Sequence, residues 1–460
     1  MNQTARHIPT LIPEPRFLYV KTFGCQMNEY DSLRVQRLLH AQGYLLTSDM
    51  ASADVIFLNT CSVREKAEQK VHSFLGRLRR LKEKRPHLKI VVAGCVAQQL
   101  GKQLLERFEY LDLVLGTRGI AAITELLQEL HETGGRRAYL PEEEAPRSPS
   151  EQQLTWFPES AALAAPVTIM QGCDNYCTYC IVPYVRGRER SRPMRDVIEE
   201  IQSLTQKGVR EILLLGQNVN SYGQGLDEKT CFAELLRRVQ SETDVRRLRF
   251  TTSHPKDLNM ELIQCFADLP CLCRALHLPV QAGSDVILSR MNRGYTAADY
   301  LAKITLLRQV CPDIGLSSDV MVGFPGETED DFRQTIQLLE AVQFDNLFSF
   351  RYSDRPYAQS STFQDKVDEP IKAQRLLELQ SLQSEITLQR NRMEVGAIRE
   401  ILVEGPSRAS NGQLTGRTQQ NRVINFVGSK ELIGETIYVK ITSAFAHSLK
   451  GEIEHPGAHP

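Results

Sequence analysis

Short apolar runs alternate with amphipathic stretches along the first part of the chain. Four of these runs have the length and the aliphatic content of buried strands: 17–22, 54–59, 89–93 and 111–115. Three intervening stretches repeat apolar residues at helical spacing: 29–42, 64–80 and 96–108. Strands that alternate with helices usually pair in parallel. The pattern therefore predicts a small parallel α/β domain over residues 15–132.

A stretch rich in proline, glycine and glutamate follows, and we predict a linker over residues 133–158. The alternation then restarts over residues 159–388. Six strand-like runs are each followed by helical periodicity: 167–170, 211–215, 247–252, 275–280, 315–322 and 345–350. Six such units predict an open version of a βα barrel, in which the loops after the strands carry the chemistry.

The C-terminal region, residues 391–455, has a different pattern. It follows a polar amphipathic helix that we predict over residues 376–394. Four short alternating runs are separated by Gly and Asn: 400–403, 413–418, 422–427 and 436–441. This spacing predicts a small β-barrel, so the fold class is α/β with a C-terminal β-barrel. Small barrels often bind RNA, although Lys and Arg only just outnumber Glu in this one.

The composition narrows the class of protein. The 460 residues, of which 42% are hydrophobic and 24% charged, are typical of a soluble globular protein. No apolar run approaches the ~18 residues that span a bilayer, and the N-terminus lacks the apolar core of a signal peptide. We therefore expect a cytoplasmic protein with no membrane partner.

The net charge of -1 does not favour nucleic acid as a partner. An RNA site must therefore come from local basic stretches. Two exist, Arg186–Arg195 and Arg77–Arg85. The first stands beside a cysteine motif and suits phosphate contacts, whereas the second is more typical of a solvated helix face.

Three of the eleven cysteines stand in that compact motif, Cys173-Asp-Asn-Tyr-Cys177-Thr-Tyr-Cys180. A 4Fe-4S cluster is usually held by four thiolates, so a loop with three leaves one iron open to a reacting ligand. The spacing resembles that of the radical S-adenosylmethionine (SAM) enzymes, in which SAM binds this iron. A zinc site is the alternative. Zinc favours four Cys or His ligands, however, and no fourth one lies within thirty residues of the motif.

Cys25, Cys61 and Cys95 each follow one of the first three predicted strands. The carboxyl ends of parallel strands share one edge of the sheet, where open α/β folds place their ligands. These cysteines can therefore converge, and we predict a second three-thiolate cluster. Taken singly, each cysteine is better explained as a small buried hydrophobe.

Loops after other strands of the predicted barrel are candidates for holding SAM. Gln217 and Asn218 follow the second strand-like run, and Asp319 lies in the fifth. We predict these three as cofactor-binding residues. His254, after the third run, is more typical of a packed or turn histidine. The remaining cysteines are predicted to be structural: Cys231, Cys265, Cys271, Cys273 and Cys311.

Five segments carry a family resemblance: Thr22-Phe-Gly-Cys25-Gln-Met-Asn, Asn59-Thr-Cys61-Ser-Val-Arg-Glu-Lys, Gly94-Cys95-Val-Ala-Gln, Gln171-Gly-Cys173-Asp-Asn-Tyr-Cys177-Thr-Tyr-Cys180 and Phe350-Arg-Tyr-Ser-Asp-Arg-Pro-Tyr. With them the chain resembles the bacterial tRNA-2-methylthio-dimethylallyladenosine synthases along nearly its whole length. The resemblance implies an N-terminal methylthiotransferase domain, a radical SAM core and a C-terminal TRAM domain. It also implies that both cysteine triads bind 4Fe-4S clusters. One departure is Ala282, where the family usually has Ser.

The family's reaction places a methylthio group on carbon 2 of the prenylated adenosine at position 37, in the anticodon loop of tRNA. The resemblance implies that the cluster on Cys173, Cys177 and Cys180 cleaves SAM to a 5′-deoxyadenosyl radical. The auxiliary cluster would supply the sulfur, which a second SAM methylates. We also expect an electron donor such as a flavodoxin or a ferredoxin, and a monomeric enzyme.

Two other functions stay open. A sister methylthiotransferase acting on threonylcarbamoyladenosine or on a ribosomal-protein aspartate would use the same clusters with a different pocket. The residues around Cys25 and Cys61 argue against it. A non-catalytic iron-sulfur RNA-binding protein is the more distant alternative, and the open iron predicted for the Cys173–Cys180 loop argues against that one.

Overall fold

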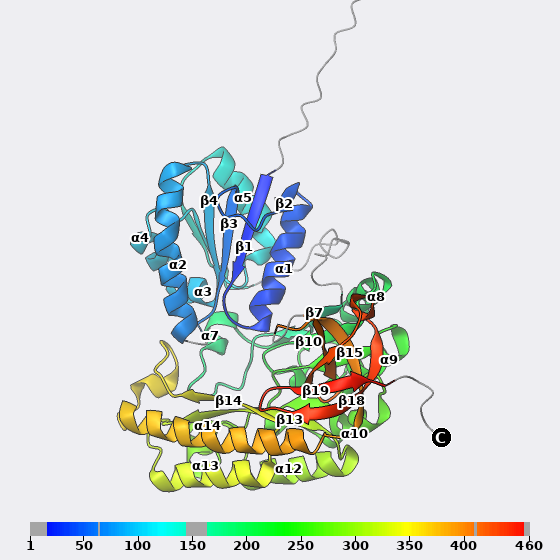
Figure 1. Ribbon diagram of the computed structural model, residues 1–460. Coiled ribbons are helices and arrows are strands. Elements are labelled where there is room, and N and C mark those ends of the chain that lie inside the picture. Colours follow the sequence, from blue (N-terminus) through cyan, green and yellow to red (C-terminus); the bar gives the residue numbers. More distant parts are fainter. Residues whose placement is uncertain (1–15, 63–64, 144–162, 409–411, 455–460) are drawn as a thin grey trace, which may run out of the picture. The chain divides into compact units, whose positions relative to one another are not determined.

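A computed structural model describes residues 16–62, 65–143, 163–408 and 412–454 (Figure 1). The chain divides into two compact units, Met1–Phe157 and Pro158–Pro460, which we call the N-terminal unit and the C-terminal unit. Among the helices of the described residues, none combines the length and the apolar character needed to cross a membrane. Each unit has its own sheet, so the two are treated separately below.

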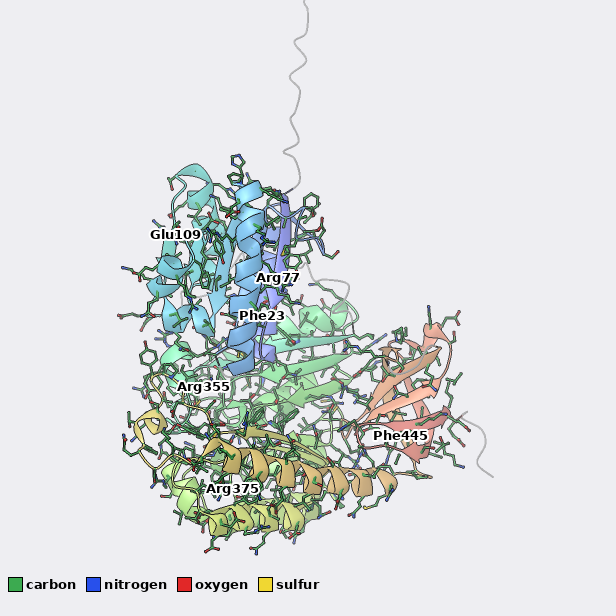
Figure 2. The ribbon with its side chains drawn as sticks, turned by 60° about the vertical axis from the view of Figure 1, so that its left-hand side comes forward. Phe23, Arg77, Glu109, Arg355, Arg375 and Phe445 are labelled. Carbon is green, nitrogen blue, oxygen red and sulfur yellow. The ribbon has the colours of Figure 1, made fainter. Side chains whose placement is uncertain are left out.

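A six-stranded parallel sheet forms the N-terminal unit, in the order β2-β1-β3-β4-β5-β6. Its strands are β1 (Arg16–Thr22), β2 (Tyr44–Leu46), β3 (Val55–Thr60), β4 (Lys89–Gly94), β5 (Leu113–Leu115) and β6 (Arg137–Tyr139). Its helices are α1 (Gln26–His40), α2 (Glu65–Lys84), α3 (Cys95–Leu100), α4 (Lys102–Arg107), η1 (Ile120–Ala122) and α5 (Ile123–Glu132). Arg77 is exposed on α2 (Figure 2) and lies 4.9 Å from the centre of the Phe74 ring. The predicted parallel α/β fold of this region is confirmed.

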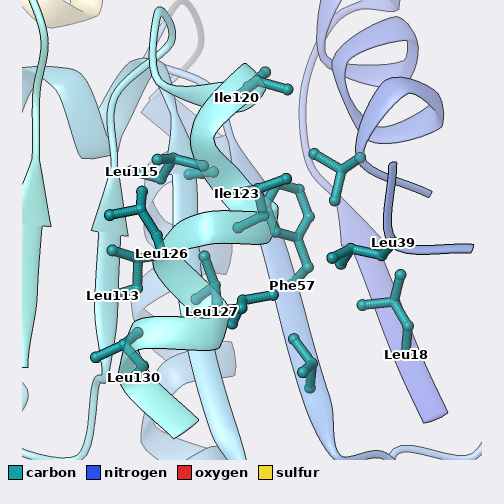
Figure 3. Close-up of a cluster of buried hydrophobic side chains, with 14 of the residues drawn as sticks. Leu18, Leu39, Phe57, Leu113, Leu115, Ile120, Ile123, Leu126, Leu127 and Leu130 are labelled. Carbon is teal, nitrogen blue, oxygen red and sulfur yellow. The ribbon is translucent and has the colours of Figure 1, made fainter. Parts of the chain in front are cut away.

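Both faces of this sheet are buried, because its strands alternate between two sets of apolar side chains. Along β3, Val55 and Phe57 belong to one cluster, together with Leu127 of α5 (Figure 3). Ile56 and Leu58 belong to the cluster on the opposite face. Burying one such side chain fully contributes roughly 1.5–3 kcal/mol. This core holds the carboxyl ends of β1, β3 and β4 side by side at one edge.

Two strands of this sheet were not predicted from the sequence pattern. β2 and β6 have three residues each, fewer than an alternation needs to be recognised. β6 pairs in parallel with β5, so residues 137–139 belong to the sheet and not to the predicted linker 133–158. The part of that stretch from residue 144 lies outside the described residues. The helix predicted over 96–108 is divided into α3 and α4 at Gly101, whose φ of +51° interrupts it.

The C-terminal unit begins with the six βα units that the pattern predicts. Their strands are β7 (Ala164–Thr168), β10 (Glu211–Leu215), β11 (Arg247–Phe250), β12 (Ala275–His277), β13 (Gly315–Val322) and β14 (Asn346–Arg351). They form two parallel sheets, β11-β10-β7 and β12-β13-β14, which a bridge between Leu248 and Leu272 connects. The helices are α7 (Val182–Arg186), α8 (Met194–Gln206), α9 (Phe232–Glu242), α10 (Met260–Asp268), α11 (Asp285–Arg290), α12 (Ala297–Val310) and α13 (Glu329–Val342). This large barrel confirms the predicted fold of the central region.

A closed barrel ends the C-terminal unit, with the strand order β15-β16-β17-β19-β18. Its strands are β15 (Ile398–Pro406), β16 (Gln413–Thr418), β17 (Val423–Val427), β18 (Thr436–Ala444) and β19 (Leu449–Ile453), and α14 (Glu369–Arg392) precedes them. Ile401, Ile424 and Phe426 are fully buried inside it. The small β-barrel is confirmed, but β19, which closes it against β17 and β18, was not predicted.

The small barrel docks on the amino ends of strands of the large barrel. Arg247 begins β11, and its two terminal nitrogens donate to the carbonyls of Arg417 and Thr418, each at 2.7 Å. Glu211 begins β10 and lies 3.2 Å from the Arg247 guanidinium, so it compensates this buried charge. The small barrel therefore docks on the rim formed by the amino ends of the large-barrel strands. The carboxyl rim, at the other end of the strands, carries the loops described next.

Candidate metal centres and SAM site

The Cys173–Cys180 loop lies at the carboxyl edge of the large barrel, between the two short strands β8 (Met170–Gln171) and β9 (Arg190–Ser191). Cys177 is buried, while Cys173 and Cys180 are partly buried. The loop is anchored at Thr178, whose N–H donates to the Met291 carbonyl at 3.1 Å and whose hydroxyl donates to the Arg290 carbonyl at 2.9 Å. The three thiols are thus carried by one short, fixed segment.

Gly172 fixes the backbone conformation at the start of the cysteine loop. Its φ is +79°, and a Cβ atom there would lie 2.0 Å from the Arg188 carbonyl oxygen. Its N–H donates to the Gln217 side-chain oxygen at 2.5 Å. Only glycine combines this conformation with this approach. Gln217, predicted from the sequence as a SAM contact, therefore also holds the cysteine loop against the end of β10.

The thiols of the loop are largely shielded from water. Burial, with a smaller contribution from the neighbouring Cys177, raises the pKa of Cys173 to about 11 and that of Cys180 to about 12. Thiols in such a place become thiolates when a metal takes their protons.

Three soft sulfur donors on one loop fit a 4Fe-4S cluster with one iron left open. Within the described part of the chain, no three Cys, His, Asp or Glu side chains are arranged to hold a single metal ion. The structure thus gives the position of the loop, and the assignment of the three cysteines as cluster ligands stays a prediction.

Unpaired polar atoms gather on the loops that follow β10 and β11. Four buried side-chain atoms have no hydrogen-bond partner among the described residues: Gln217 Nε2, Asn218 Oδ1, Ser253 Oγ and His254 Nε2. A buried polar atom without a partner costs about 1–3 kcal/mol. Both loops lie at the same strand ends as the cysteine loop, so these donors and acceptors fit a polar ligand such as SAM.

His254 was expected to be a turn residue, and it is one. It caps a short turn, η4 (Pro255–Asp257), and its Nδ1 accepts the Lys256 N–H at 3.2 Å. The proton of the neutral ring must therefore be on Nε2, the atom without a partner. Burial, together with the nearby positive charges of Arg293, Lys256 and Lys303, lowers the pKa of His254 to about 2. Sequence reasoning missed this second property, because no local pattern marks a buried donor.

Asp319 lies in β13, in the other three-stranded sheet. Its carboxylate is 3.5 Å from His277 Nε2, and His277 Nδ1 is 3.0 Å from the Ser317 hydroxyl. The described contacts of Asp319 thus join it to β12, and its part in holding SAM stays a prediction. Ala282 is buried in a hydrophobic cluster after β12, so the hydroxyl that the family usually has there is replaced by a packed methyl group.

The second triad lies in the N-terminal unit. Cys25 caps the start of α1, Cys61 follows β3 directly, and Cys95 is the first residue of α3. The strands before them, β1, β3 and β4, are neighbours in the sheet, so all three cysteines stand at one edge, as the pattern predicts. Cys25 is exposed, whereas Cys61 and Cys95 are buried. Whether they share a cluster stays a prediction.

A polar network fixes the loop of Cys25 against that of Cys61. The Asn28 amide nitrogen donates to the Thr60 carbonyl at 2.8 Å and to the Asn59 side-chain oxygen at 3.1 Å. Cys25 Sγ is 3.5 Å from the Asn28 side-chain oxygen. A Cβ atom on Gly24 would lie 2.2 Å from the Cys61 Cβ, so the two loops touch there. Asn28 and Asn59 therefore hold together the loops that carry Cys25 and Cys61.

The two basic stretches are largely paired inside their own units. Arg188 pairs with Asp174, and Arg195 pairs with Glu199. In the other stretch, Lys82 pairs with Asp112 at 2.8 Å. Side chains that already have acidic partners contribute less to phosphate binding, so the charge alone does not mark an RNA site.

Aromatic side chains mark the surface beside the cysteine loop more clearly. Tyr179 packs against a hydrophobic cluster, while Tyr176 is 46% exposed with a φ of +47°. Tyr184 and Tyr357 are 48% and 62% exposed, and their ring centres are 6.4 Å apart. Tyr357 has a φ of +69°, and a bulky residue with positive φ often occurs at a functional site.

The chain matches three family models, one in each predicted region. Residues 17–116 match an uncharacterized protein family, UPF0004, residues 167–339 match the radical SAM superfamily, and residues 392–453 match the TRAM domain.

Two relatives are similar over almost the whole chain. The tRNA-2-methylthio-N(6)-dimethylallyladenosine synthase of Syntrophobacter fumaroxidans is 62% identical, with 97% of each chain covered. The synthase of the same name from Geobacter sulfurreducens is 48% identical, with 96% of this chain and 98% of the relative covered. Among solved structures, the radical SAM methyltransferase TsrM from Kitasatospora setae has a TM-score of 0.54 at 15% identity, over 75% of this chain and 77% of that one. That similarity concerns the fold alone.

Proposed function

The chain belongs to the family of tRNA-2-methylthio-N(6)-dimethylallyladenosine synthases, and from this premise we propose which of its residues perform the reaction. It is a radical SAM enzyme that methylthiolates carbon 2 of the prenylated adenosine at position 37 of tRNA. The observation that carries the residue assignment is the fixed Cys173–Cys180 loop, with unpaired polar atoms on the neighbouring strand ends.

Cys173, Cys177 and Cys180 would hold a 4Fe-4S cluster, and three thiolates would leave one of its irons for SAM. When bound, the cluster supplies the electron that cleaves SAM, and the resulting carbon radical activates the inert carbon 2. Asn218 offers an acceptor, Oδ1, and His254 offers a neutral donor, Nε2–H, to polar atoms of SAM. These residues orient the cofactor, and their burial excludes water from it.

The triad of Cys25, Cys61 and Cys95 would hold an auxiliary 4Fe-4S cluster, which would supply the sulfur of the methylthio group, while a second SAM would supply its methyl group. Support comes from the three neighbouring strand ends on which they stand and from the contact of the Gly24 and Cys61 loops.

The anticodon loop of tRNA is the part of the substrate that must reach the cysteine loop. Unpaired RNA bases bind by stacking on aromatic side chains. The exposed rings of Tyr176, Tyr184 and Tyr357 are suited to this, and the C-terminal TRAM barrel offers a second RNA contact. The enzyme works as a monomer in the cytoplasm, where tRNA is found, and a flavodoxin or ferredoxin reduces it.

Mass spectrometry of nucleosides tests the proposal. The reconstituted protein is incubated anaerobically with SAM, a reductant and tRNA that carries the prenylated adenosine. A methylthio mass increase on that nucleoside, lost in C173A, supports the assignment. If both clusters are loaded and 5′-deoxyadenosine accumulates while the nucleoside stays unchanged, the substrate assignment moves to that of a sister methylthiotransferase. If neither product forms with fully loaded wild-type protein, the assignment is wrong.

A further inference from the structure

One buried arginine touches the cysteine loop from a distant part of the chain. Arg293 lies in the turn after α11, is only 4% exposed, and places Nη1 3.4 Å from Cys177 Sγ. The same nitrogen is 3.3 Å from the Tyr179 hydroxyl. Its Nη2 donates to the Pro279 carbonyl at 2.7 Å, and its Nε donates to the Tyr295 hydroxyl at 3.0 Å. The guanidinium is therefore held in one orientation, facing the sulfur.

No aspartate or glutamate forms an ion pair with Arg293 among the residues that the structure describes. Its oxygen partners are two hydroxyls and a carbonyl, all of them neutral. Arg375 on α14 (Figure 2) is also buried, with 7% exposed, but Glu327 lies 2.8 Å from it and compensates its charge. A buried cation without an anion is costly. The Cys177 sulfur, once it is a thiolate ligand, is the anion in contact with Arg293.

We propose that Arg293 is a positioning residue of the cluster on Cys173, Cys177 and Cys180, which fixes the Cys177 thiolate and raises the reduction potential of the cluster. The inference rests on the proposed function, because it requires that cluster. Three thiolates make the site anionic, and reduction adds one more negative charge. A fixed positive charge beside a ligand sulfur therefore stabilises the reduced state more than the oxidised state. Net charge and hydrogen bonds to the sulfurs are the means by which proteins set cluster potentials.

A redox titration followed by electron paramagnetic resonance tests this role. The parent protein carries C25A, C61A and C95A, so that only the cluster of the Cys173–Cys180 loop titrates. In R293Q we expect the reduction equilibrium to shift by about tenfold toward the oxidised state, which is 59 mV for one electron. R293K keeps the charge, and we expect its midpoint potential to stay closer to that of the parent.

The matched control is R290Q. Arg290 is three residues away, partly exposed, and paired with Asp365 at 2.6 Å. Its carbonyl, which accepts the Thr178 hydroxyl, is kept in R290Q. Its side chain makes no described hydrogen bond to the cysteine loop, so removal of its charge should leave the midpoint potential unchanged. A shift in R290Q as large as that in R293Q would mean that any nearby charge has this effect, and would overturn the specific role of Arg293.

The other outcomes separate the inference from the proposed function. An R293Q protein with full iron content and the parent potential overturns the inference alone. If R293Q folds but loses its iron, R293K decides: a cluster near the parent potential supports the role of the charge, and loss of iron there too overturns it. A parent protein that takes up no reducible cluster overturns both the inference and the proposed function.

Discussion

Gly172 shows how much one residue decides at the entry of the cysteine loop. In G172A the new Cβ would meet the Arg188 carbonyl oxygen at 2.0 Å, so the loop must move. We expect the protein to lose up to about half of its iron, the share that this loop would bind, because the three thiols would no longer share one position. Iron analysis and absorbance of the reconstituted protein measure this.

Gly208 provides the control for that substitution. It has a similar φ, +91°, but a Cβ there would meet nothing within 4 Å. G208A should therefore lose only the stability that corresponds to the backbone strain, roughly 1–3 kcal/mol, and should keep its iron. Equal iron content in the two variants would contradict the importance of the Gly172 contact.

His254 predicts a pH dependence of stability. Its pKa is about 2 in the folded protein, below the ordinary 6.5, so below pH 6.5 the unfolded state binds a proton that the folded state does not. The stabilisation is therefore complete above pH 6.5 and is lost as the pH falls. The groups that face the ring are Arg293, Lys256, Lys303 and Tyr295, and the three cations disfavour protonation of the folded state.

The comparison is between wild type and H254N, whose side-chain oxygen can still cap the Lys256 N–H. From pH 6.5 to pH 5.5 the wild type should lose about 1 kcal/mol of unfolding free energy more than H254N. Urea unfolding at the two pH values measures the difference. Parallel losses in both proteins would show that His254 is not the group that titrates.

For single residues, the sequence predicts those site residues whose motif lies within a short stretch of the chain. Cys173, Cys177 and Cys180 are recognised because their spacing fits within eight residues of chain. Arg293 is 116 residues away from Cys177, and nothing near it in the sequence resembles a site. His254 carries a local signal only for its turn. Contacts of this kind depend on the packing of the whole barrel, which no periodicity describes.

Among the elements, the β16–β17 turn depends on one buried carboxylate. Asp345, just before β14, lies 3.0 Å from Arg390 and also pairs with Arg422, while its second oxygen accepts the Leu316 N–H at 2.7 Å. In D345N the hydrogen bond to Leu316 can persist, but two largely buried cations lose their shared anion. We expect the free energy of unfolding to fall by about 3 kcal/mol, with faster hydrogen exchange in β16 and β17.

R333A is the control for that change. Arg333 pairs with Glu329 and Glu378, and all three side chains are substantially exposed. Its removal should cost less than about 1 kcal/mol. Denaturant unfolding of the two variants gives both values, and a D345N protein as stable as R333A would mean that the docked barrel does not depend on this charge.

The elements also show where sequence patterns fail. β10 and β13 were predicted residue for residue. β10 is an almost continuous apolar run, which marks a strand buried on both faces. β13 instead alternates buried and half-buried positions along most of its length, which is the other strand signal. β19 (Leu449–Ile453) has a lysine, a glycine and a glutamate among its five residues. Its place is fixed by pairing with β17 and β18, far away along the chain, which the local pattern does not contain.

On the scale of the whole molecule, each compact unit carries one cysteine triad and its own hydrophobic core. Loss of one triad should therefore leave the other unit folded and able to bind its cluster. We expect C25A/C61A/C95A to keep about half of the wild-type iron and to cleave SAM to 5′-deoxyadenosine, but to form no methylthio product. C173A/C177A/C180A should also keep about half of the iron, yet cleave no SAM.

Iron content, 5′-deoxyadenosine and modified nucleoside, measured on the same samples, distinguish these variants. C271A/C273A is the matched control, because these two cysteines are buried next to β12, outside both triads. That protein should keep all its iron and form both products. Methylthio product from C25A/C61A/C95A would contradict the auxiliary cluster, because the sulfur would then have come from elsewhere. Loss of all iron in that variant would show instead that the triads are not independent, and that cluster binding in one unit requires the other.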